Sequence, residues 1–373
     1  MSAYINRIAT AVPPYQVHDT FIQFARTLLA GNRALPLFER MVNRAQIAQR
    51  WSCLQPAADP AGEAVDANRF YLRGRFPSTA DRMRLFEVEA PPLAAEAVDG
   101  LDLGTGVHSI SHVIIATCTG FSAPGLDIEL IRRCGLNPSV ERTVVGFMGC
   151  YAAINALKLA RHIVRSEPQA KVLVVCIELC TLHLQETDDL EQVLSFLLFG
   201  DGCAAALISA EPVGLALERF HAVLVPEAAD LISWHIRESG FDMFLSGRVP
   251  GALGKALATG SAAIFDGIPP EAIELWAVHP GGRSILDAVD TALELRPTAL
   301  AASRDVLLRF GNMSSATIMF VLQALMRNAR PGALGCGMAF GPGLTAETML
   351  FRAEGQALPS RLAGARAADR AEA

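Results

Sequence analysis

The sequence predicts an α/β fold with largely parallel sheets and two duplicated halves. The runs HVIIAT (112–117) and VLVVCI (172–177) are nearly continuous apolar segments of strand length, as in strands buried on both faces. Helical patterns separate such runs, which is typical of sheets covered by helices. Spacing adds a third observation: Cys150 follows the end of the first run by 33 positions, and Asn312 follows His279, at the end of a later strand, by 33. Equal spacing indicates an internal duplication with a pseudo-two-fold axis.

Each half is expected to run from a strand through a loop and a helix to a turn and a second helix. Hydrophobic periodicity places expected strands at 3–10, 112–117, 172–177 and 273–278. It places expected helices at 21–29, 78–101, 126–136 and 284–295, and turns followed by helices at 144–160 and 311–325. Pro91-Pro92 is expected to interrupt the second of these helices, because proline lacks a backbone N–H. Residues 54–66, rich in Pro, Ala and acids, are predicted to form a loop.

Composition narrows the function classes. A chain of 373 residues with 51% hydrophobic residues suits two domains or one large duplicated domain. No apolar run of eighteen or more is present, and the start lacks a signal-peptide pattern, so neither an integral membrane segment nor export is expected. Eight cysteines without framework or metal-ligand spacing fit a reducing cytoplasm. The net charge of −6 argues against nucleic acid as the main partner.

Cys150 stands in VVGFMGCYAAINALKLA, between a Gly-flanked turn and a run of mostly good helix formers. This pattern places the cysteine at or near a helix N-terminus. There the helix dipole favours an anion, so the thiol is expected to lose its proton more easily. The alternative is a buried cysteine that acts as a small hydrophobic residue.

His279 and Asn312 each have an alternative explanation on their own. His279 precedes Pro-Gly-Gly and could be a hydrogen-bonded core histidine, and Asn312 could cap a helix. Together with Cys150 they fit one chemistry. A thiolate takes an acyl group from a thioester, and histidine pairs with the thiolate. Histidine and asparagine then donate to one carbonyl oxygen, that of a malonyl thioester that becomes an enolate as CO2 leaves.

Three arginines in LFERMVNRAQIAQRW, Arg40, Arg44 and Arg50, lie near a helical spacing. One interpretation is a solvated helix face, the commoner role of such charges. The other is a binding site for the phosphates of a cofactor, because arginine binds phosphate through paired N–H donors.

Several motifs in register resemble the type III polyketide synthases, the chalcone synthase-like branch of the thiolase superfamily. They are GFMGCYAA around Cys150, FGDG (199–202), HPGG (279–282), GNMSSA (311–316) and FGPGLTAE (340–347), and the resemblance reaches about Phe351. It implies a thiolase-like five-layer αβαβα fold, a homodimer, free CoA thioesters as substrates, and no metal or redox cofactor. The expected halves are residues 1–213, with the cysteine, and 214–352, with histidine and asparagine, followed by a surface or disordered tail at 353–373.

The resemblance assigns roles to individual residues. Cys150 becomes the acylated nucleophile, His279 and Asn312 drive decarboxylation of malonyl-CoA, and Phe199 is a gatekeeper. The second gatekeeper phenylalanine aligns with Met243, with Phe241 and Phe244 as neighbouring alternatives. Other cavity positions fall on Cys118, Thr119, Cys180, His183, Trp234, Ser314, Pro342 and Gly343, and Ala123 replaces a methionine that reaches into the neighbouring subunit of plant enzymes.

The cavity positions depart from those of the plant enzymes. Trp234 stands where they have glycine and fills volume, so a flavonoid cavity is not expected. His183 stands where they have threonine; it is either an extra acid/base or, as we favour, a side chain packed in the wall.

The product class follows from the nearest resemblance. The segment FYLRGRFPSTADRMRLFE (70–87) resembles bacterial enzymes that make alkylpyrones or alkylresorcinols from fatty acyl-CoA, the preferred interpretation. A short starter giving a phloroglucinol- or naphthalene-type product is the alternative. Rival functions are a ketoacyl synthase that depends on an acyl carrier protein, a thiolase that uses Cys336 as a second reactive cysteine, and an acyl-CoA-binding protein without turnover.

Overall fold

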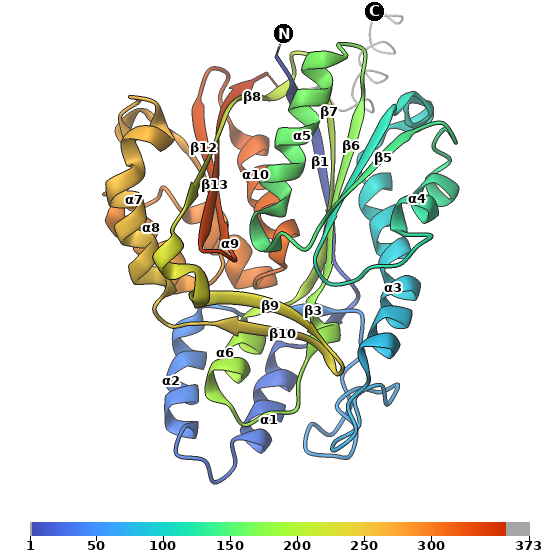
Figure 1. The fold of residues 1–373 in the computed structure, drawn as a ribbon, viewed down its shortest axis with the longest axis vertical. Helices are drawn as coiled ribbons and strands as arrows, with labels where there is room; N and C mark the ends of the chain where they lie inside the picture. Colours follow the sequence, from blue (N-terminus) through green and yellow to red (C-terminus); the bar gives the residue numbers. More distant parts are fainter. Residues whose placement is uncertain (1, 356–373) are drawn as a thin grey trace, which may run out of the picture.

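The structure is a computed structural model and describes residues 2–355. Its elements form five layers, seen side by side in Figure 1. Helices α7 (Val249–Phe265) and α8 (Arg283–Ala292) cover one side, and α3 (Thr79–Asp99) and α4 (Leu126–Cys134) cover the other. Two sheet regions lie between them and enclose a central helical layer. The layers agree with the predicted αβαβα arrangement.

The strands of the first half are β1 (Tyr4–Ala11), β4 (His112–Thr117), β5 (Glu141–Gly146), β6 (Val172–Leu179) and β7 (Asp201–Ser209). Their order in the sheet is β1-β7-β6-β4-β5. Strands β4, β5 and β6 are parallel, whereas β7 is antiparallel to both of its neighbours. Every residue of β4 and β6 is buried, as their continuous apolar runs predict.

The second half repeats the first four positions of this order. Its strands are β8 (Gly214–Leu224), β11 (Leu275–Val278), β12 (Leu334–Gly341) and β13 (Thr345–Glu354), arranged β8-β13-β12-β11. Strands β1 and β8 pair at two positions and join the halves into one nine-stranded sheet. The predicted boundary at 213/214 falls between β7 and β8; the division of the chain there stays a prediction.

The central layer consists of α5 (Ala152–Ser166) and α10 (Thr317–Asn328), the two helices that follow the key turns. The buried face of α5 carries four alanines together with Ile154, Leu157 and Val164. Small side chains allow the helix to approach strands of both halves closely. Helix α5 contacts β4, β6, β12 and β13, and α10 contacts β1, β7 and β11. Both turns are thereby brought to the centre of the molecule.

The remaining elements lie around the lower end of the sheets in Figure 1. They include α1 (His18–Leu28), α2 (Leu35–Ala45), α6 (Leu190–Leu198), β2 (Tyr15–Gln16), β3 (Trp51–Ser52), and a hairpin of β9 (Ile232–Arg237) and β10 (Gly240–Leu245). Helix α9 (Ala301–Phe310) packs instead against α8, α10 and β11. No helix within residues 2–355 is long and apolar enough to cross a membrane.

Two predictions about element ends were wrong. Helix α3 runs unbroken through Pro91 and Pro92, because its buried face, with Phe86, Leu93 and Val98, packs on the sheet and outweighs the lost backbone hydrogen bonds. Strand β13 extends to Glu354, so the predicted tail starts too early at 353. The rest of that tail, from 356 onward, lies outside the described residues.

Candidate active site

Cys150, His279 and Asn312 line one cavity of about 50 Å³. Cys150 lies in the single 3₁₀ turn η2 (Gly149–Tyr151) that leads into α5, as predicted. Gly149 has φ +75°, and a Cβ there would lie 2.6 Å from Cδ of Pro342, so only glycine fits beside the 340–343 loop. His279 directly follows β11. The duplication thus brings three residues far apart in sequence into contact with one space.

Asn312 is held with a defined amide orientation. Its Oδ1 accepts hydrogen bonds from the backbone N–H of Ser314 at 2.8 Å and from Oγ1 of Thr317 at 3.4 Å. Its Nδ2 donates a long hydrogen bond of 3.3 Å to the carbonyl of Gly281 and also bonds the Cys150 thiol. Since the oxygen is occupied, the amide presents N–H groups to the cavity. This is the donor that an oxyanion hole requires.

His279 is buried, and neither ring nitrogen has a hydrogen-bond partner among the described residues. Burial lowers the pKa of the imidazole to about 3, so the ring is neutral near neutral pH. A neutral imidazole carries one N–H donor and one acceptor nitrogen. Both ring nitrogens are therefore available to pair with a group in the cavity.

The expectation of an easily ionised Cys150 was wrong for the free protein. Burial raises the pKa of the thiol to about 12, although hydrogen bonds from Ser314 and Asn312 act in the opposite direction. The helix-dipole argument counted only the favourable field at the end of α5. It could not count the loss of hydration in an enclosed cavity, which disfavours the charged form.

The other predicted cavity residues fall into two groups. Phe199, Met243, Trp234, Cys118, Ser314 and Pro342 line the cavity with the three central residues. Thr119, Cys180, His183, Gly343 and Ala123 do not. Ala123 is exposed on the loop before α4, on the surface of this chain. Of the three candidates for the second gatekeeper, Met243 lines the cavity and Phe241 and Phe244 do not; the gatekeeper role stays a prediction.

His183 is a packed wall residue in the structure. Its Nδ1 accepts from the backbone N–H of Phe241 at 3.0 Å, and its Nε2 donates to the carbonyl of Thr119 at 2.7 Å. Its ring stacks on Phe241 with centroids 4.2 Å apart and meets Trp234 edge-on. The indole of Trp234 in turn donates to the carbonyl of Cys118 at 2.8 Å. These bonded rings form a rigid wall on one side of the cavity.

Glu178 is a buried carboxyl that the sequence reasoning missed. It accepts hydrogen bonds from the N–H of Cys118, from Oγ1 of Thr119 and from Oγ of Ser315, at 3.0, 2.8 and 2.5 Å. Burial raises its pKa. It therefore ties the loop after β4 to the turn that carries Asn312. An acid at the end of the apolar run VLVVCIEL was the available signal.

Arg50 is not a phosphate-binding residue, contrary to one interpretation of the three arginines. It is buried, donates from Nε to Nδ1 of His18, and donates from Nη1 to the carbonyls of Phe196 and Phe199. Burial lowers its pKa to about 9, so the guanidinium stays charged near neutral pH. Arg50 binds the last carbonyls of α6 and holds the backbone of Phe199.

Arg44 lies where a phosphate could reach it. With Arg283 at the start of α8 it lines a groove of about 500 Å³ between α2, α6 and α8. The groove runs beside the catalytic cavity, because Gly281 lines the cavity and Gly282 lines the groove. Arg40 is exposed on α2 but does not line this groove.

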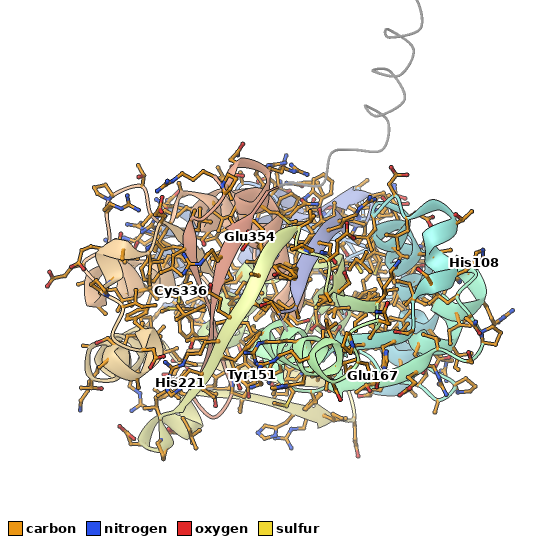
Figure 2. The ribbon with its side chains drawn as sticks, turned by 90° about the horizontal axis from the view of Figure 1, so that it is seen from above. His108, Tyr151, Glu167, His221, Cys336 and Glu354 are labelled. Carbon is orange, nitrogen blue, oxygen red and sulfur yellow. The ribbon has the colours of Figure 1, made fainter. Side chains whose placement is uncertain are left out.

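Two further expectations concern Cys336 as a second reactive cysteine and the presence of metal ligands. Cys336 is buried within β12 and does not line the cavity; Figure 2 shows it on the second-half strands, apart from Tyr151, the neighbour of Cys150 in sequence. It therefore does not share the cavity with Cys150, as a thiolase mechanism would require. Within residues 2–355, no group of three or more His, Cys, Asp or Glu side chains is arranged to hold a metal ion.

Comparisons with known proteins agree with this geometry. Residues 7–212 match the N-terminal domain of chalcone and stilbene synthases, and residues 217–354 match the C-terminal domain. The chain is 36% identical to the alpha-pyrone synthesis polyketide synthase-like Pks18 of Mycobacterium tuberculosis, over 94% of this chain and 91% of the relative.

Solved structures have the same fold. PKS-I of the brown alga Ectocarpus siliculosus superposes with a TM-score of 0.84 at 30% identity, over 94% of this chain and 98% of its own. The C-terminal type III polyketide synthase domain of Steely1 from Dictyostelium superposes with a TM-score of 0.85 at 24% identity, over 95% and 99%. The chain therefore belongs to the chalcone and stilbene synthase family and is a type III polyketide synthase.

Proposed function

We propose that this enzyme loads a fatty acyl-CoA starter on Cys150, extends it with malonyl-CoA and cyclises the product to an alkylpyrone or alkylresorcinol. The observation that carries the proposal is the single cavity shared by Cys150, His279 and Asn312. The relative Pks18, named for alpha-pyrone synthesis, supports the product class.

Loading begins with a neutral thiol beside a neutral imidazole. As the sulfur of Cys150 attacks the thioester carbonyl, the thiol proton moves to the acceptor nitrogen of His279. The bond from the carbonyl carbon to the CoA sulfur then breaks. The leaving CoA thiolate takes the proton back from His279, so the imidazole returns to its neutral form and Cys150 carries the acyl group.

Extension uses the same two donors. The N–H of His279 and the Nδ2 group of Asn312 bind the thioester oxygen of malonyl-CoA. The bond to the carboxylate breaks, CO2 leaves, and the electron pair forms an enolate whose oxygen the two donors stabilise. The enolate carbon attacks the acyl carbonyl on Cys150, and the cysteine sulfur leaves as a thiolate, which takes up a proton from water before the next loading. These steps use protein side chains and CoA thioesters.

The groove between α2 and α8 is the proposed site for CoA. Arg44 offers guanidinium donors for its phosphates, and Arg283 offers those left by its bonds to Asp287 and to the carbonyl of Arg44. The start of α8 adds backbone N–H groups. The groove adjoins the cavity, because Gly281 lines the cavity and the next residue, Gly282, lines the groove. Arg40, exposed on the same helix, is proposed as a peripheral contact.

A homodimer is proposed from the free edge of the sheet. Strand β5 is the outermost strand of the first half, and residues 141–144 are exposed, including Val144. An uncovered edge is prone to pair with another chain. A second copy paired through β5 would also bring a neighbouring subunit close to the loop of Ala123. The cytoplasm is the proposed location, because all eight cysteines are free, as in a reducing compartment.

One observation favours the short-starter alternative. The catalytic cavity of about 50 Å³ is far smaller than the ~150 Å³ cavity that holds one benzene in a well-studied engineered protein. The wall of Trp234, His183 and Phe241 closes it on one side. Unless the cavity extends elsewhere, only a short acyl group fits.

The test is a mass-spectrometric product profile from purified protein, malonyl-CoA and acyl-CoA starters from acetyl to stearoyl, without carrier protein. Alkylpyrones or alkylresorcinols from long starters support the proposal. Products from short starters alone support the alternative. Turnover only after addition of an acyl carrier protein would favour the ketoacyl synthase, and no turnover with any carrier would favour a binding protein.

A further inference from the structure

The segment 48–51, which runs into β3, caps the C-terminal end of α9. Two of its backbone N–H groups donate to the carbonyl of Leu308, at 2.7 and 3.1 Å. The indole of Trp51 donates to the carbonyl of Arg309 at 3.1 Å. These carbonyls belong to the last turn of the helix, where the backbone lacks partners within the helix itself. Because α9 ends two residues before Asn312, this cap fixes the chain on one side of the catalytic amide.

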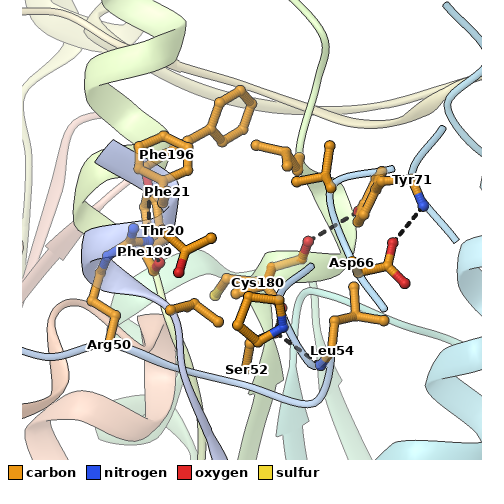
Figure 3. A pocket seen from close by; sticks show the side chains of 15 residues that line it. Thr20, Phe21, Arg50, Ser52, Leu54, Asp66, Tyr71, Cys180, Phe196 and Phe199 are labelled. Carbon is orange, nitrogen blue, oxygen red and sulfur yellow. Dashed lines mark hydrogen bonds between the residues drawn. The ribbon is translucent and has the colours of Figure 1, made fainter. Parts of the chain in front are cut away.

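Arg50, in the same segment, caps α6 instead. Its Nη1 donates to the carbonyls of Phe196 and Phe199, at 2.8 and 2.5 Å. Figure 3 shows Arg50 next to Phe199, where the guanidinium reaches the end of α6. Its Nε donates to Nδ1 of His18 at 3.0 Å. Burial and the charge of Arg50 lower the pKa of His18 to about 4, so the ring is neutral near neutral pH and accepts this bond. The guanidinium is therefore held from two sides and fixes the carbonyl end of α6.

The ends of the two helices pair directly beside Arg50. The N–H of Asn312 donates to the carbonyl of Leu198 at 2.8 Å, and the N–H of Gly200 donates to the carbonyl of Asn312 at 3.0 Å. These bonds form a parallel bridge between Phe199 and Asn312. The carbonyl of Phe199 is not used in the bridge and accepts from Arg50. Arg50 thus binds the residue of α6's end that is paired with Asn312.

Two glycines allow the side chain of Arg50 to lie against this bridge. Gly311 has φ +67°, and a Cβ there would lie 2.8 Å from Cγ of Arg50 and 2.7 Å from the carbonyl oxygen of Leu198. Glycine alone combines this backbone conformation with such close neighbours. A Cβ on Gly200 would lie 3.4 Å from Cβ of Arg50. Arg50 is therefore packed against both chains of the bridge as well as bonded to one of them.

The amide of Asn312 moves with its backbone. Its Oδ1 is bonded to Ser314 and Thr317, which belong to the turn that Asn312 itself begins. A shift of this turn would therefore shift Nδ2 by a similar amount, and the side chain could not compensate without breaking those bonds. A catalytic group displaced by about 1 Å can cost about a hundredfold in rate. What holds the bridge in place thus bears on the oxyanion donor.

We propose that Arg50 is a positioning residue for decarboxylation, which sets the place of Nδ2 of Asn312 in the catalytic cavity through the carbonyl of Phe199 and the bridge. The inference rests on the proposed function, in which Asn312 stabilises the enolate oxygen of malonyl-CoA. Arg50 is not among the residues that line the catalytic cavity, so it acts through Asn312 and does not touch the substrate there. Loading uses Cys150 and His279 and depends on Arg50 much less.

The first test compares Arg50→Met with Arg7→Met. Arg7 also donates from Nη1 to two main-chain carbonyls, those of Leu101 and Asp102 after the end of α3, and it does not line the cavity. In Arg50→Met, malonyl-CoA decarboxylation should fall about tenfold to a hundredfold and acyl loading on Cys150 less than about threefold. The ratio of the two rates should stay at the wild-type value in Arg7→Met. Equal losses of decarboxylation and loading in Arg50→Met, or a ratio that falls as far in Arg7→Met, would overturn the proposal.

Arg50→Lys provides a milder variant in case the methionine variant does not fold. Lysine keeps the charge but replaces the planar fork by one ammonium group, which cannot hold two carbonyls and His18 in the same geometry. The ratio of decarboxylation to loading should therefore fall at least about threefold. A folded Arg50→Lys protein with the wild-type ratio would overturn the proposal.

A double-mutant cycle with Asn312→Asp tests whether the effect passes through the amide. Aspartate keeps an acceptor for Ser314 but lacks the donor that Arg50 is proposed to place. In the Asn312→Asp background, the Arg50 substitution should change the residual release of labelled CO2 less than about twofold, because the two changes act on one donor. A loss as large as in the wild-type background would show independent effects and overturn the proposal. Wild-type decarboxylation by Asn312→Asp alone would instead refute the proposed function, and this inference with it.

Discussion

Replacing Asn312 by alanine removes two functions of one side chain: the Nδ2 donor proposed for catalysis and the Oδ1 acceptor that stabilises the fold. The change removes the Nδ2 donor, and loss of one oxyanion donor typically costs about 10²–10³ in rate, or about 2.7–4 kcal/mol. It also removes the acceptor for the buried N–H of Ser314, which costs about 1–3 kcal/mol of stability. Asn312→Ala should therefore decarboxylate malonyl-CoA at least a hundredfold more slowly and unfold at lower denaturant, whereas acyl loading on Cys150 should fall much less.

Asn312→Asp is the matched control, because aspartate keeps an acceptor for Ser314 but lacks the donor. It should recover most of the stability and none of the decarboxylation. Release of CO2, intact mass after incubation with acyl-CoA, and urea titration measure the three quantities separately. Equal losses of loading and decarboxylation in Asn312→Ala, or wild-type decarboxylation by Asn312→Asp, would refute the assigned role.

Three further predictions follow from the site. Alkylation of Cys150 by iodoacetamide should rise about tenfold per pH unit between pH 6 and 9, because only the thiolate reacts and burial raises the thiol pKa to about 12; a rate that is constant over this range would reveal a preformed thiolate–imidazolium pair. Arg50→Met should lower the free energy of unfolding by more than about 2 kcal/mol, since it frees two buried carbonyls. Arg44→Gln, at an exposed position, should keep the wild-type stability and raise KM for acyl-CoA. An Arg50→Met protein of wild-type stability, or an unchanged KM in Arg44→Gln, would contradict these placements. Trp234→Gly should lengthen or re-cyclise the product, and an unchanged product profile would remove Trp234 from the working cavity.

The sequence predicted which three residues share one cavity, because their positions depend on local rules. A strand end, a Gly-rich turn and a helix start recur with the same spacing in both halves, so the fold brings Cys150, His279 and Asn312 together wherever the sheets form. The central helices and the buried strands were predicted for the same reason. Their apolar patterns are long and regular.

The failures concern burial, which depends on contacts between distant segments. Arg44 and Arg50 belong to one charged stretch of the sequence, yet Arg50 is enclosed by α6 and α1 whereas Arg44 is exposed to solvent. The pKa of Cys150 was misjudged because a helix end is visible in the sequence and the enclosure of the cavity is not. Pro91-Pro92 was misjudged because the packing of α3 outweighs the local preference.

The most direct test of the account is a chase experiment on the wild-type enzyme. Dodecanoyl-CoA is added first, the acyl adduct is mapped to a peptide, and malonyl-CoA is then added without carrier protein. The account predicts an adduct on Cys150 that disappears after malonyl-CoA is added, with release of CO2 and an alkylpyrone or alkylresorcinol. An adduct on another cysteine, or one on Cys150 that malonyl-CoA does not discharge, would contradict it.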